Sequence, residues 1–247
     1  MKSTVSVQNF SLTLGDKEIV HNLNFEVKPG EVFAFLGANG SGKTSTIRSL
    51  LGLYEPTKGE LLVNGRRYSS KDAMTVGYLP EERGLYTRVS AIENLTYFGE
   101  MKGLSRADAR KEGLAFLEAV GLKDKATLKL KSLSGGQQQK VQLGVAVMGN
   151  PDLLILDEPT KGLDPVNRKL LLDIVEAHRE QGAAVIYITH LMEEVERLAD
   201  RLFIIKDGQA KAYGTVAAVK KEFGAKSIED VFVSIYDETP KKKKGDA

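Results

Sequence analysis

The chain reads Gly37-Ala38-Asn39-Gly40-Ser41-Gly42-Lys43-Thr44 directly after an apolar run at 31–36, and a helical pattern follows over about 43–51. This stretch fits the phosphate-binding loop pattern G-x-x-x-x-G-K-[ST], in the strand–loop–helix context that the pattern requires. Glycines let backbone N–H groups turn inward around phosphates, and the helix N-terminus adds positive potential. Lys43 offers a charge for the β and γ phosphates, and Thr44 offers a hydroxyl for Mg²⁺. We therefore expect residues 37–44, with Ser45 after them, to bind a nucleoside triphosphate.

A second apolar run, at 153–156, ends in two adjacent carboxylates, Asp157 and Glu158. At the carboxyl edge of a parallel sheet such residues face the ligand crevice. Asp157 is suited to hold Mg²⁺ together with Thr44, and Glu158 is suited to polarise an attacking water as a general base. An acidic pair after a strand is weak evidence alone, because acidic residues often begin loops. Combined with the phosphate-binding loop, it indicates hydrolysis.

The rest of the pattern predicts an α/β fold with a mostly parallel sheet covered by helices, because short apolar strands alternate with helical segments. Expected strands lie at 59–63, 74–79, 152–156, 183–189 and 201–206, and expected helices at 166–181 and 191–199. The first ~30 residues alternate between apolar and polar side chains, which predicts a separate β subdomain of antiparallel strands. Between about 84 and 150 helical spacing dominates, which predicts a helical subdomain inserted into the α/β core.

The composition is that of an ordinary globular domain, with 247 residues and 42% hydrophobic content. A net charge of +2 does not indicate nucleic acid, and no cysteine is present for disulfides, thiolate zinc sites or nucleophilic catalysis. No apolar run approaches the ~18–20 residues that span a bilayer, and the N-terminus lacks the apolar core of a signal peptide. We therefore expect residues 1–236 to form one cytoplasmic domain, followed by a basic, disordered tail at 237–247.

The deciding stretch for function is Leu133-Ser134-Gly135-Gly136-Gln137, in which a serine and two glycines open a helix. The hydroxyl and the free N–H groups at such a helix start converge on an anion site. Taken with the stretches at 37–44, 153–158 and 189–190, it resembles the ATP-binding cassette of ABC transporters, over about residues 4–210. The resemblance implies a P-loop NTPase core that binds ATP with Mg²⁺, hydrolyses it and powers a separate membrane-spanning permease subunit.

The resemblance also assigns roles to single residues. Ser134, Gly135, Gly136 and Gln137 would face the γ-phosphate that a second cassette holds, so that ATP lies between two subunits, in a homodimer. Asp164, in the loop at 162–164, would communicate between the two sites, and His190 would contact the γ-phosphate and the attacking water. The protein would then be peripheral on the cytoplasmic face of the membrane, which it would meet only through the permease.

Two positions depart from the family pattern. The family has a glutamine where this chain has Glu81, and that residue would contact Mg²⁺ and the water; the stretch 77–86 resembles an exporter-type subgroup, so we interpret Glu81 as a variation. The family also stacks an aromatic ring on adenine just before Gly15, where this chain has Leu14. Phe10 is the nearest aromatic residue in sequence, at a mismatched position, so base selectivity is expected to differ.

Two further segments have competing interpretations. Leu85, Tyr86 and Val89 lie in a polar stretch, and would either pack internally or form the surface that receives the permease. The segment 227–232 resembles the closing part of exporter cassettes, and is more simply a short helix that packs on the core.

Three other functions fit the sequence less well. Chromosome-maintenance ATPases insert long heptad arms between the two nucleotide motifs, but the residues from Lys43 to Asp157 hold no sustained heptad pattern. Ribosome-binding factors carry two cassettes in one chain, and this chain has one. A module that binds ATP without hydrolysis would have no need of both Glu158 and His190.

Overall fold

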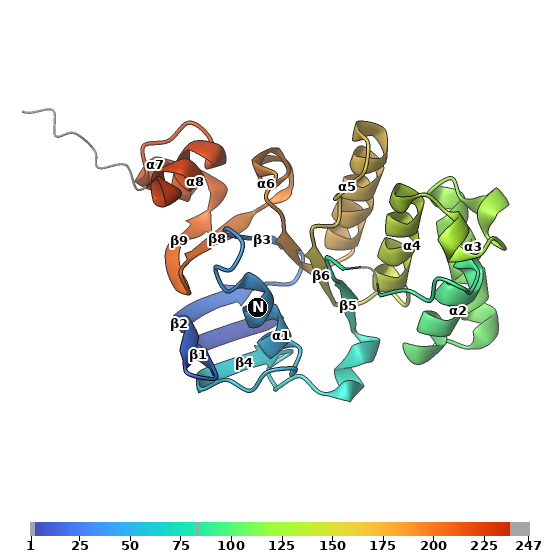
Figure 1. Cartoon of the computed structure of the whole chain (residues 1–247), viewed down its shortest axis with the longest axis horizontal. Helices are drawn as coiled ribbons and strands as arrows, with labels where there is room; N and C mark the ends of the chain where they lie inside the picture. Colours follow the sequence, from blue (N-terminus) through green and yellow to red (C-terminus); the bar gives the residue numbers. More distant parts are fainter. Residues whose placement is uncertain (1–2, 83, 238–247) are drawn as a thin grey trace, which may run out of the picture.

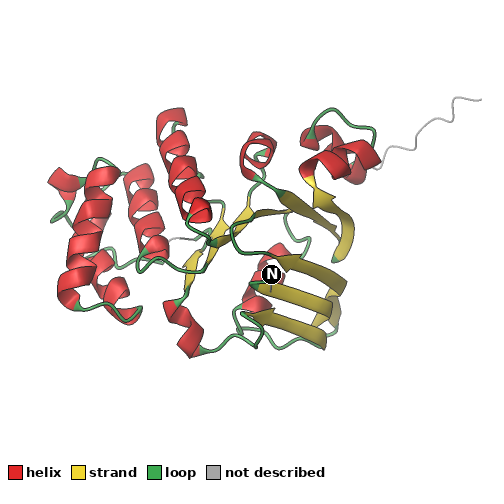
Figure 2. Ribbon diagram, turned by 180° about the vertical axis from the view of Figure 1, so that it is seen from behind, coloured by secondary structure: helices red, strands yellow, loops and turns green. Residues whose placement is uncertain are grey.

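The computed structural model describes residues 3–82 and 84–237, which form two β-sheets with helices around them (Figure 1). A three-stranded sheet has the order β2-β1-β4, and a six-stranded sheet has the order β5-β6-β7-β3-β8-β9. Figure 2 shows the two sheets as separate layers. The α/β fold that the sequence predicts is therefore confirmed.

The small sheet is antiparallel and consists of β1 (Val5–Leu14), β2 (Lys17–Val27) and β4 (Lys58–Val63). Along β2 the side chains of Leu23, Phe25 and Val27 are buried, whereas Asn22 and Asn24 are exposed. This alternation follows from the period of two along a strand with one covered face. The predicted N-terminal antiparallel subdomain is confirmed.

The larger sheet is parallel except at one edge. Its strands are β3 (Val32–Leu36), β5 (Val76–Leu79), β6 (Leu153–Asp157), β7 (Ala184–Ile188), β8 (Arg201–Lys206) and β9 (Gln209–Thr215). Only β9 runs antiparallel, paired with β8. The sequence analysis missed β9, because an edge strand with mostly exposed side chains lacks the apolar run that marks the buried strands.

Helices follow the strands and also form a group of their own. The helices that flank the sheets are α1 (Lys43–Leu50), α5 (Pro165–Glu180), α6 (Met192–Leu198), α7 (Val216–Glu222) and α8 (Ile228–Tyr236). The separate group contains α2 (Ala91–Met101), α3 (Arg106–Ala119) and α4 (Gly135–Val147). Short 3-10 turns lie at Ser70–Met74, Lys123–Lys125 and Leu130–Ser132. In the described residues no helix combines the length and the apolar character needed to cross a bilayer.

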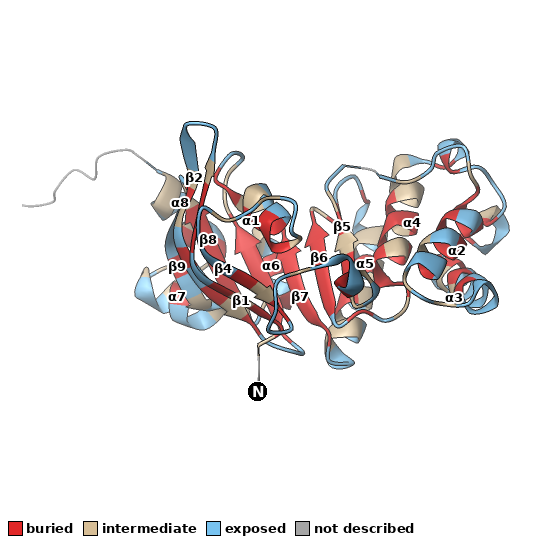
Figure 3. Ribbon diagram, turned by 90° about the horizontal axis from the view of Figure 1, so that it is seen from below, coloured by how far each residue is buried: buried red, intermediate tan, exposed pale blue. Residues whose placement is uncertain are grey.

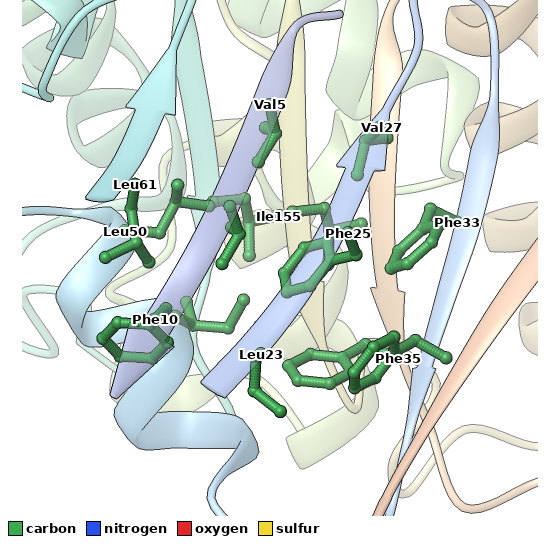
Figure 4. Close-up of a cluster of buried hydrophobic side chains, with 14 of the residues drawn as sticks. Val5, Phe10, Leu23, Phe25, Val27, Phe33, Phe35, Leu50, Leu61 and Ile155 are labelled. Atoms are coloured by element: carbon green, nitrogen blue, oxygen red, sulfur yellow. The ribbon is translucent and has the colours of Figure 1, made fainter. Parts of the chain in front are cut away.

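Strand β6 shows how the parallel sheet is buried on both faces. Leu153 and Ile155 belong to the cluster between the two sheets, whereas Leu154 and Leu156 belong to the cluster under α4 and α5. Figure 4 shows the inter-sheet cluster, where side chains from the small sheet meet those of β3 and β6. Viewed from below, the central strands are almost wholly buried (Figure 3). Two covered faces explain why the strand reads as a continuous apolar run.

Helices α2, α3 and α4 lie together at one end of the molecule (Figure 1). They share a separate apolar cluster that includes Leu95, Leu117 and Val141. At Gly144 a Cβ atom would lie 2.6 Å from the Phe116 ring, so glycine permits the close approach of α3 and α4. This group occupies the stretch where the sequence analysis expects a helical insertion.

The opposite end carries α7 and α8, which the sequence analysis expected only as one short closing helix. Ile228 and Val231 of α8 are fully buried against the outer part of the larger sheet, so its packing role is confirmed. The expected basic tail lies, from residue 238 onward, outside the described residues.

Candidate functional site

The phosphate-loop residues connect the end of β3 to the first turn of α1. Gly42, at the N-cap of α1, has a φ of 110°, a conformation that glycine adopts without steric cost. At Gly37 a Cβ atom would lie 2.6 Å from the carbonyl oxygen of Ile205 in β8. Two of the glycines in the pattern are therefore required for a tight turn packed closely against the sheet.

Lys43 folds back over this loop. Its ammonium donates to the carbonyl oxygens of Gly37 at 2.6 Å and Ala38 at 3.1 Å. Burial lowers the pKa of Lys43, and the nearby carboxylates of Asp157, Glu158 and Glu81 partly offset that effect. Charge-assisted bonds to phosphate oxygens are stronger than those to neutral carbonyls, so this ammonium is placed to exchange its partners for a phosphate.

Asp157 ends β6 and is 6% exposed. The pKa of its carboxyl is raised to about 6, chiefly by burial and also by the charges of Glu81 and Glu158, against the opposing charges of Lys43 and Arg48. Removal from water and neighbouring negative charge both disfavour the ionised form. A buried carboxylate among other carboxylates is a suitable ligand for a cation.

Glu158 and His190 meet where the neighbouring strands β6 and β7 end. Glu158 has a φ of 49°, and its N–H donates to the carbonyl oxygen of Ile188 at 2.9 Å. His190 Nδ1 lies 2.8 Å from Glu158 Oε2. The Glu158 side chain is 13% exposed and that of His190 is 68% exposed. The two residues that the sequence analysis named separately therefore form one hydrogen-bonded pair.

Glu81 follows β5 and makes a different contact. Its carboxylate accepts from the Lys161 ammonium at 2.7 Å, and both side chains are largely exposed. Its negative charge still raises the pKa values of Asp157 and Lys43, so Glu81 interacts electrostatically with both residues.

Ser134 is the N-cap of α4. Its hydroxyl accepts from the N–H of Gln137 at 3.3 Å, and the Gln137 side-chain oxygen accepts from the N–H of Ser134 at 3.0 Å. Such a reciprocal pair caps the helix start and leaves the Ser134 residue exposed. Asp164 similarly caps α5, by accepting from the N–H groups of Val166 and Asn167 at 3.0 Å.

Two glutamines that the sequence analysis did not single out connect α4 with the loops that follow β5 and β6. Gln139 donates to the carbonyl oxygen of Pro159 at 2.9 Å, next to Glu158. Gln142 donates to the carbonyl oxygens of Pro80 at 2.9 Å and Glu82 at 3.3 Å, on either side of Glu81. Both residues are buried. Their spacing of three residues, which places both side chains on one face of a helix, was the available signal in the sequence.

Comparison with known proteins decides the family. Residues 20–161 match the family described as ABC transporter. The chain belongs to the ABC transporter family. As an ATP-binding cassette of this family, it binds and hydrolyses ATP and powers transport by a membrane transporter.

Several relatives of this cassette are similar over most of their length. An ABC transporter ATP-binding protein of Methanocaldococcus jannaschii is 43% identical over 87% of this chain and 79% of its own. The linearmycin resistance ATP-binding protein of Bacillus subtilis is 39% identical over 93% of this chain and 75% of its own. The Nod factor export ATP-binding protein I of Cupriavidus metallidurans is 38% identical over 87% of this chain and 72% of its own. A solved ATP-binding subunit of an ABC transporter has a TM-score of 0.88 at 29% identity, covering 94% of this chain and 99% of its own.

Leu14, which the sequence analysis expects near adenine, is 39% exposed at the end of β1. Phe10, the nearest aromatic residue in sequence, is fully buried between the small sheet and α1 (Figure 4). A ring in the core cannot stack on a base, so Phe10 does not replace the missing aromatic residue.

Proposed function

We propose that residues 37–45, with Asp157, hold MgATP in this cassette, and that Glu158 and His190 carry out its hydrolysis. The observation that carries this proposal is the 2.8 Å contact between Glu158 and His190, beside the buried Asp157. A general base needs a partner that orients it and a position within reach of the reacting water. Glu158 would take a proton from that water, and His190 would hold the Glu158 carboxylate in place.

Mg²⁺ fits this site as an ion that protein and phosphate oxygens would coordinate together. Within residues 3–82 and 84–237 no cluster of three or more His, Asp or Glu side chains is grouped to hold a metal by itself. Mg²⁺ in nucleotide sites is held by one or two protein oxygens together with phosphates and waters. The exposed Thr44 at the start of α1 and the carboxylate of Asp157 supply such oxygens, and Glu81 is the third candidate. When bound, the ion would neutralise charge on the phosphates.

We also propose that two copies of the chain complete each site, as a homodimer. The helix start supports this, because its first turn offers N–H groups and a hydroxyl to an anion. Ser134 is exposed there, and Gly135, Gly136 and Gln137 are half-buried. Asp164 is exposed as well, at the start of α5, and would lie at the contact between the copies.

The permease is proposed to dock on the loop before α2 and on helices α2 and α3, which would keep the cassette peripheral on the cytoplasmic face. A pocket of about 430 Å³ opens there, lined among others by Tyr86, Val89, Glu93, Tyr97, Arg106 and Arg110. Tyr86 is 52% exposed and Tyr97 is 43% exposed. Leu85, in contrast, is half-buried against the helical cluster, which favours internal packing for that residue. Exposed aromatic residues ringed by charges suit a short amphipathic segment of a partner.

Replacing Glu158 tests the proposed chemistry. Glu158→Gln keeps the shape and removes the proton acceptor, so the rate of ATP hydrolysis should fall by about 10²–10⁴-fold while MgATP binding survives. Steady-state hydrolysis and equilibrium binding are measured on the same preparation. Chelation of divalent ions should abolish hydrolysis by the unaltered protein.

Two neighbouring acids serve as controls. Glu81→Gln introduces the residue that the family has at this position and should retain hydrolysis. Glu82→Gln alters an exposed acid beside it and should have no effect. Hydrolysis by Glu158→Gln at the unaltered rate would remove Glu158 from its role.

A further inference from the structure

We propose that the hydroxyl of Tyr236, at the end of α8, positions the phosphate-binding loop for nucleotide. It accepts a hydrogen bond from the N–H of Ala38 at 2.8 Å and donates one to the carbonyl oxygen of Ile205 at 2.6 Å. Ala38 lies within the loop, and Ile205 lies on β8 next to it. The hydroxyl therefore connects a helix almost 200 residues away in sequence to the phosphate site. This inference rests on the proposed role of residues 37–45.

The N–H of Ala38 belongs to the same planar peptide unit as the carbonyl of Gly37. That carbonyl accepts from the Lys43 ammonium at 2.6 Å. One peptide unit is thus held from both sides, by Tyr236 on its N–H and by Lys43 on its oxygen. Because the unit is rigid, the Tyr236 hydroxyl determines the direction in which the Gly37 carbonyl points, and so helps to set the position of Lys43.

The Tyr236 ring is itself firmly placed. It stacks on Phe232 with ring centroids 4.4 Å apart, and the Lys206 ammonium lies 5.4 Å from its centroid. Lys206 also donates to the carbonyl oxygen of Ile235 at 3.2 Å, which ties the end of α8 to β8. Burial raises the pKa of the Tyr236 phenol above its ordinary value, so the hydroxyl keeps its proton at neutral pH.

A second anchor lies farther along the loop. The carbonyl oxygen of Ser41 accepts from the N–H of Gly208, in the turn between β8 and β9, at 3.0 Å. The loop is therefore held at Ala38 by α8 and at Ser41 by the β8–β9 turn. With the second anchor kept, removing the first should loosen the Gly37–Ala38 peptide alone. Since a ligand then has to order that peptide on binding, its affinity should fall.

The test compares the full-length protein with Tyr236→Phe, which removes the hydroxyl and keeps the ring. MgADP is titrated by calorimetry, so that binding is measured apart from hydrolysis. We expect the Kd to rise about 3- to 10-fold, the range for losing one neutral hydrogen bond. At saturating MgATP, kcat should be unchanged, because the lost interaction is the same in the ground state and the transition state. Hydrogen exchange of the amides at 37–41 should quicken in the nucleotide-free variant.

Tyr213→Phe is the matched control. Tyr213 also lies in the C-terminal part of the chain, in β9, and its hydroxyl accepts from the N–H of Glu26 at 3.4 Å, away from the loop. This variant should leave the Kd unchanged. Phe232→Leu keeps the Tyr236 hydroxyl but removes its stacking partner, and should raise the Kd by a smaller factor.

The outcomes separate the two proposals. If the unaltered protein fails to bind MgADP, the proposed nucleotide site is wrong. If the unaltered protein binds but Tyr236→Phe has the same Kd and only a lower melting temperature, Tyr236 is merely structural and the inference is overturned. An equal rise in Kd for Tyr213→Phe would overturn it as well.

Discussion

At the scale of single residues, Leu14 distinguishes this cassette from the family pattern. If Leu14, at the exposed end of β1, lies beside adenine as expected, its aliphatic side chain would offer a hydrophobic contact but no π-face. Stacking of a base on an aromatic ring contributes about 1–3 kcal/mol in comparable contacts. Without it, selectivity depends on polar groups around the base.

We therefore expect the protein to discriminate weakly between ATP and GTP. Competition binding of the two nucleotides measures this directly. Leu14→Tyr should restore the stack and tighten ATP binding by about 5- to 150-fold, the factor that corresponds to that stacking energy. A preference of the unaltered protein for ATP above about a hundredfold would contradict this expectation.

At the scale of elements, helix α4 connects several parts of the site. Its start at Ser134 is the proposed contact with the partner cassette, and Gln139 and Gln142 hold the loops that carry Glu158 and Glu81. Its last carbonyls are capped by Lys102, which donates to Ala146 at 2.6 Å and Met148 at 3.0 Å. A cation at a helix C-terminus also interacts favourably with the helix dipole.

The Lys102 cap predicts a pH dependence. Burial lowers the pKa of Lys102 to about 8, with Glu112 opposing the shift, whereas in the unfolded chain it is about 10.4. Between these two values the unfolded chain binds more protons, so the free energy of unfolding should rise with pH. Melting temperatures of the unaltered protein and Lys102→Met, compared from pH 7.5 to 10, isolate this contribution. The difference should shift in favour of the unaltered protein as pH rises; a constant difference would show that the pKa of Lys102 is not lowered.

The loop before α2 predicts a coupling phenotype. The Tyr86 ring contacts Tyr97 edge-on, with ring centroids 5.5 Å apart, and is stacked on Phe98, with centroids 6.1 Å apart. The Tyr86 side chain nevertheless remains half-exposed. Tyr86→Glu should uncouple ATP hydrolysis from the permease, because a charge would have to lose its hydration at the contact. MgATP binding should be unchanged.

The control for this variant is Val233→Glu, which alters an exposed apolar residue of α8 at the far end of the molecule. Hydrolysis stimulated by the permease is measured for both variants in reconstituted membranes. Normal coupling in Tyr86→Glu would exclude Tyr86 from the docking surface. Loss of folding would instead show that its ring is part of the helical core.

At the scale of the whole molecule, the strand ends that carry Lys43, Asp157, Glu158 and His190 lie between the helical group α2–α4 and the C-terminal helices (Figure 1). The exposed Ser134 caps its own helix within the chain. In the proposed homodimer the partner cassette would bring its own copy of this helix start to the phosphates, so we expect dimerisation to depend on bound ATP.

Glu158→Gln should accordingly elute as a dimer when MgATP is present and as a monomer when it is absent, because the unhydrolysed nucleotide holds both copies. Adding Ser134→Arg should abolish that dimer by placing bulk and charge against the partner site. Size-exclusion chromatography with light scattering measures both. A monomeric Glu158→Gln protein with bound ATP at high concentration would count against a site shared by two copies.

The amino-acid sequence by itself determined the fold class, the phosphate-binding loop and the pairing of Asp157 with Glu158. These signals are local: a strand buried on both faces needs an apolar run, and a loop that binds phosphate needs glycines at set spacings. For the same reason the strands from β3 to β8 and the helices α1, α5 and α6 were predictable within a few residues, whereas α2, α3 and α4 were expected only as a helical region. The exposed edge strand β9 left no such signal.

Only the tertiary structure decided which distant groups meet. It brought His190 to Glu158 and Tyr236 to Ala38, paired Glu81 with Lys161, and buried Phe10 in the core. Hydrogen bonds between loops at the ends of different strands depend on strand order and on the path of the connecting chain. Neither is written in the spacing of residues along one segment, so the contacts of the site emerge only when the sheet and its helices are assembled.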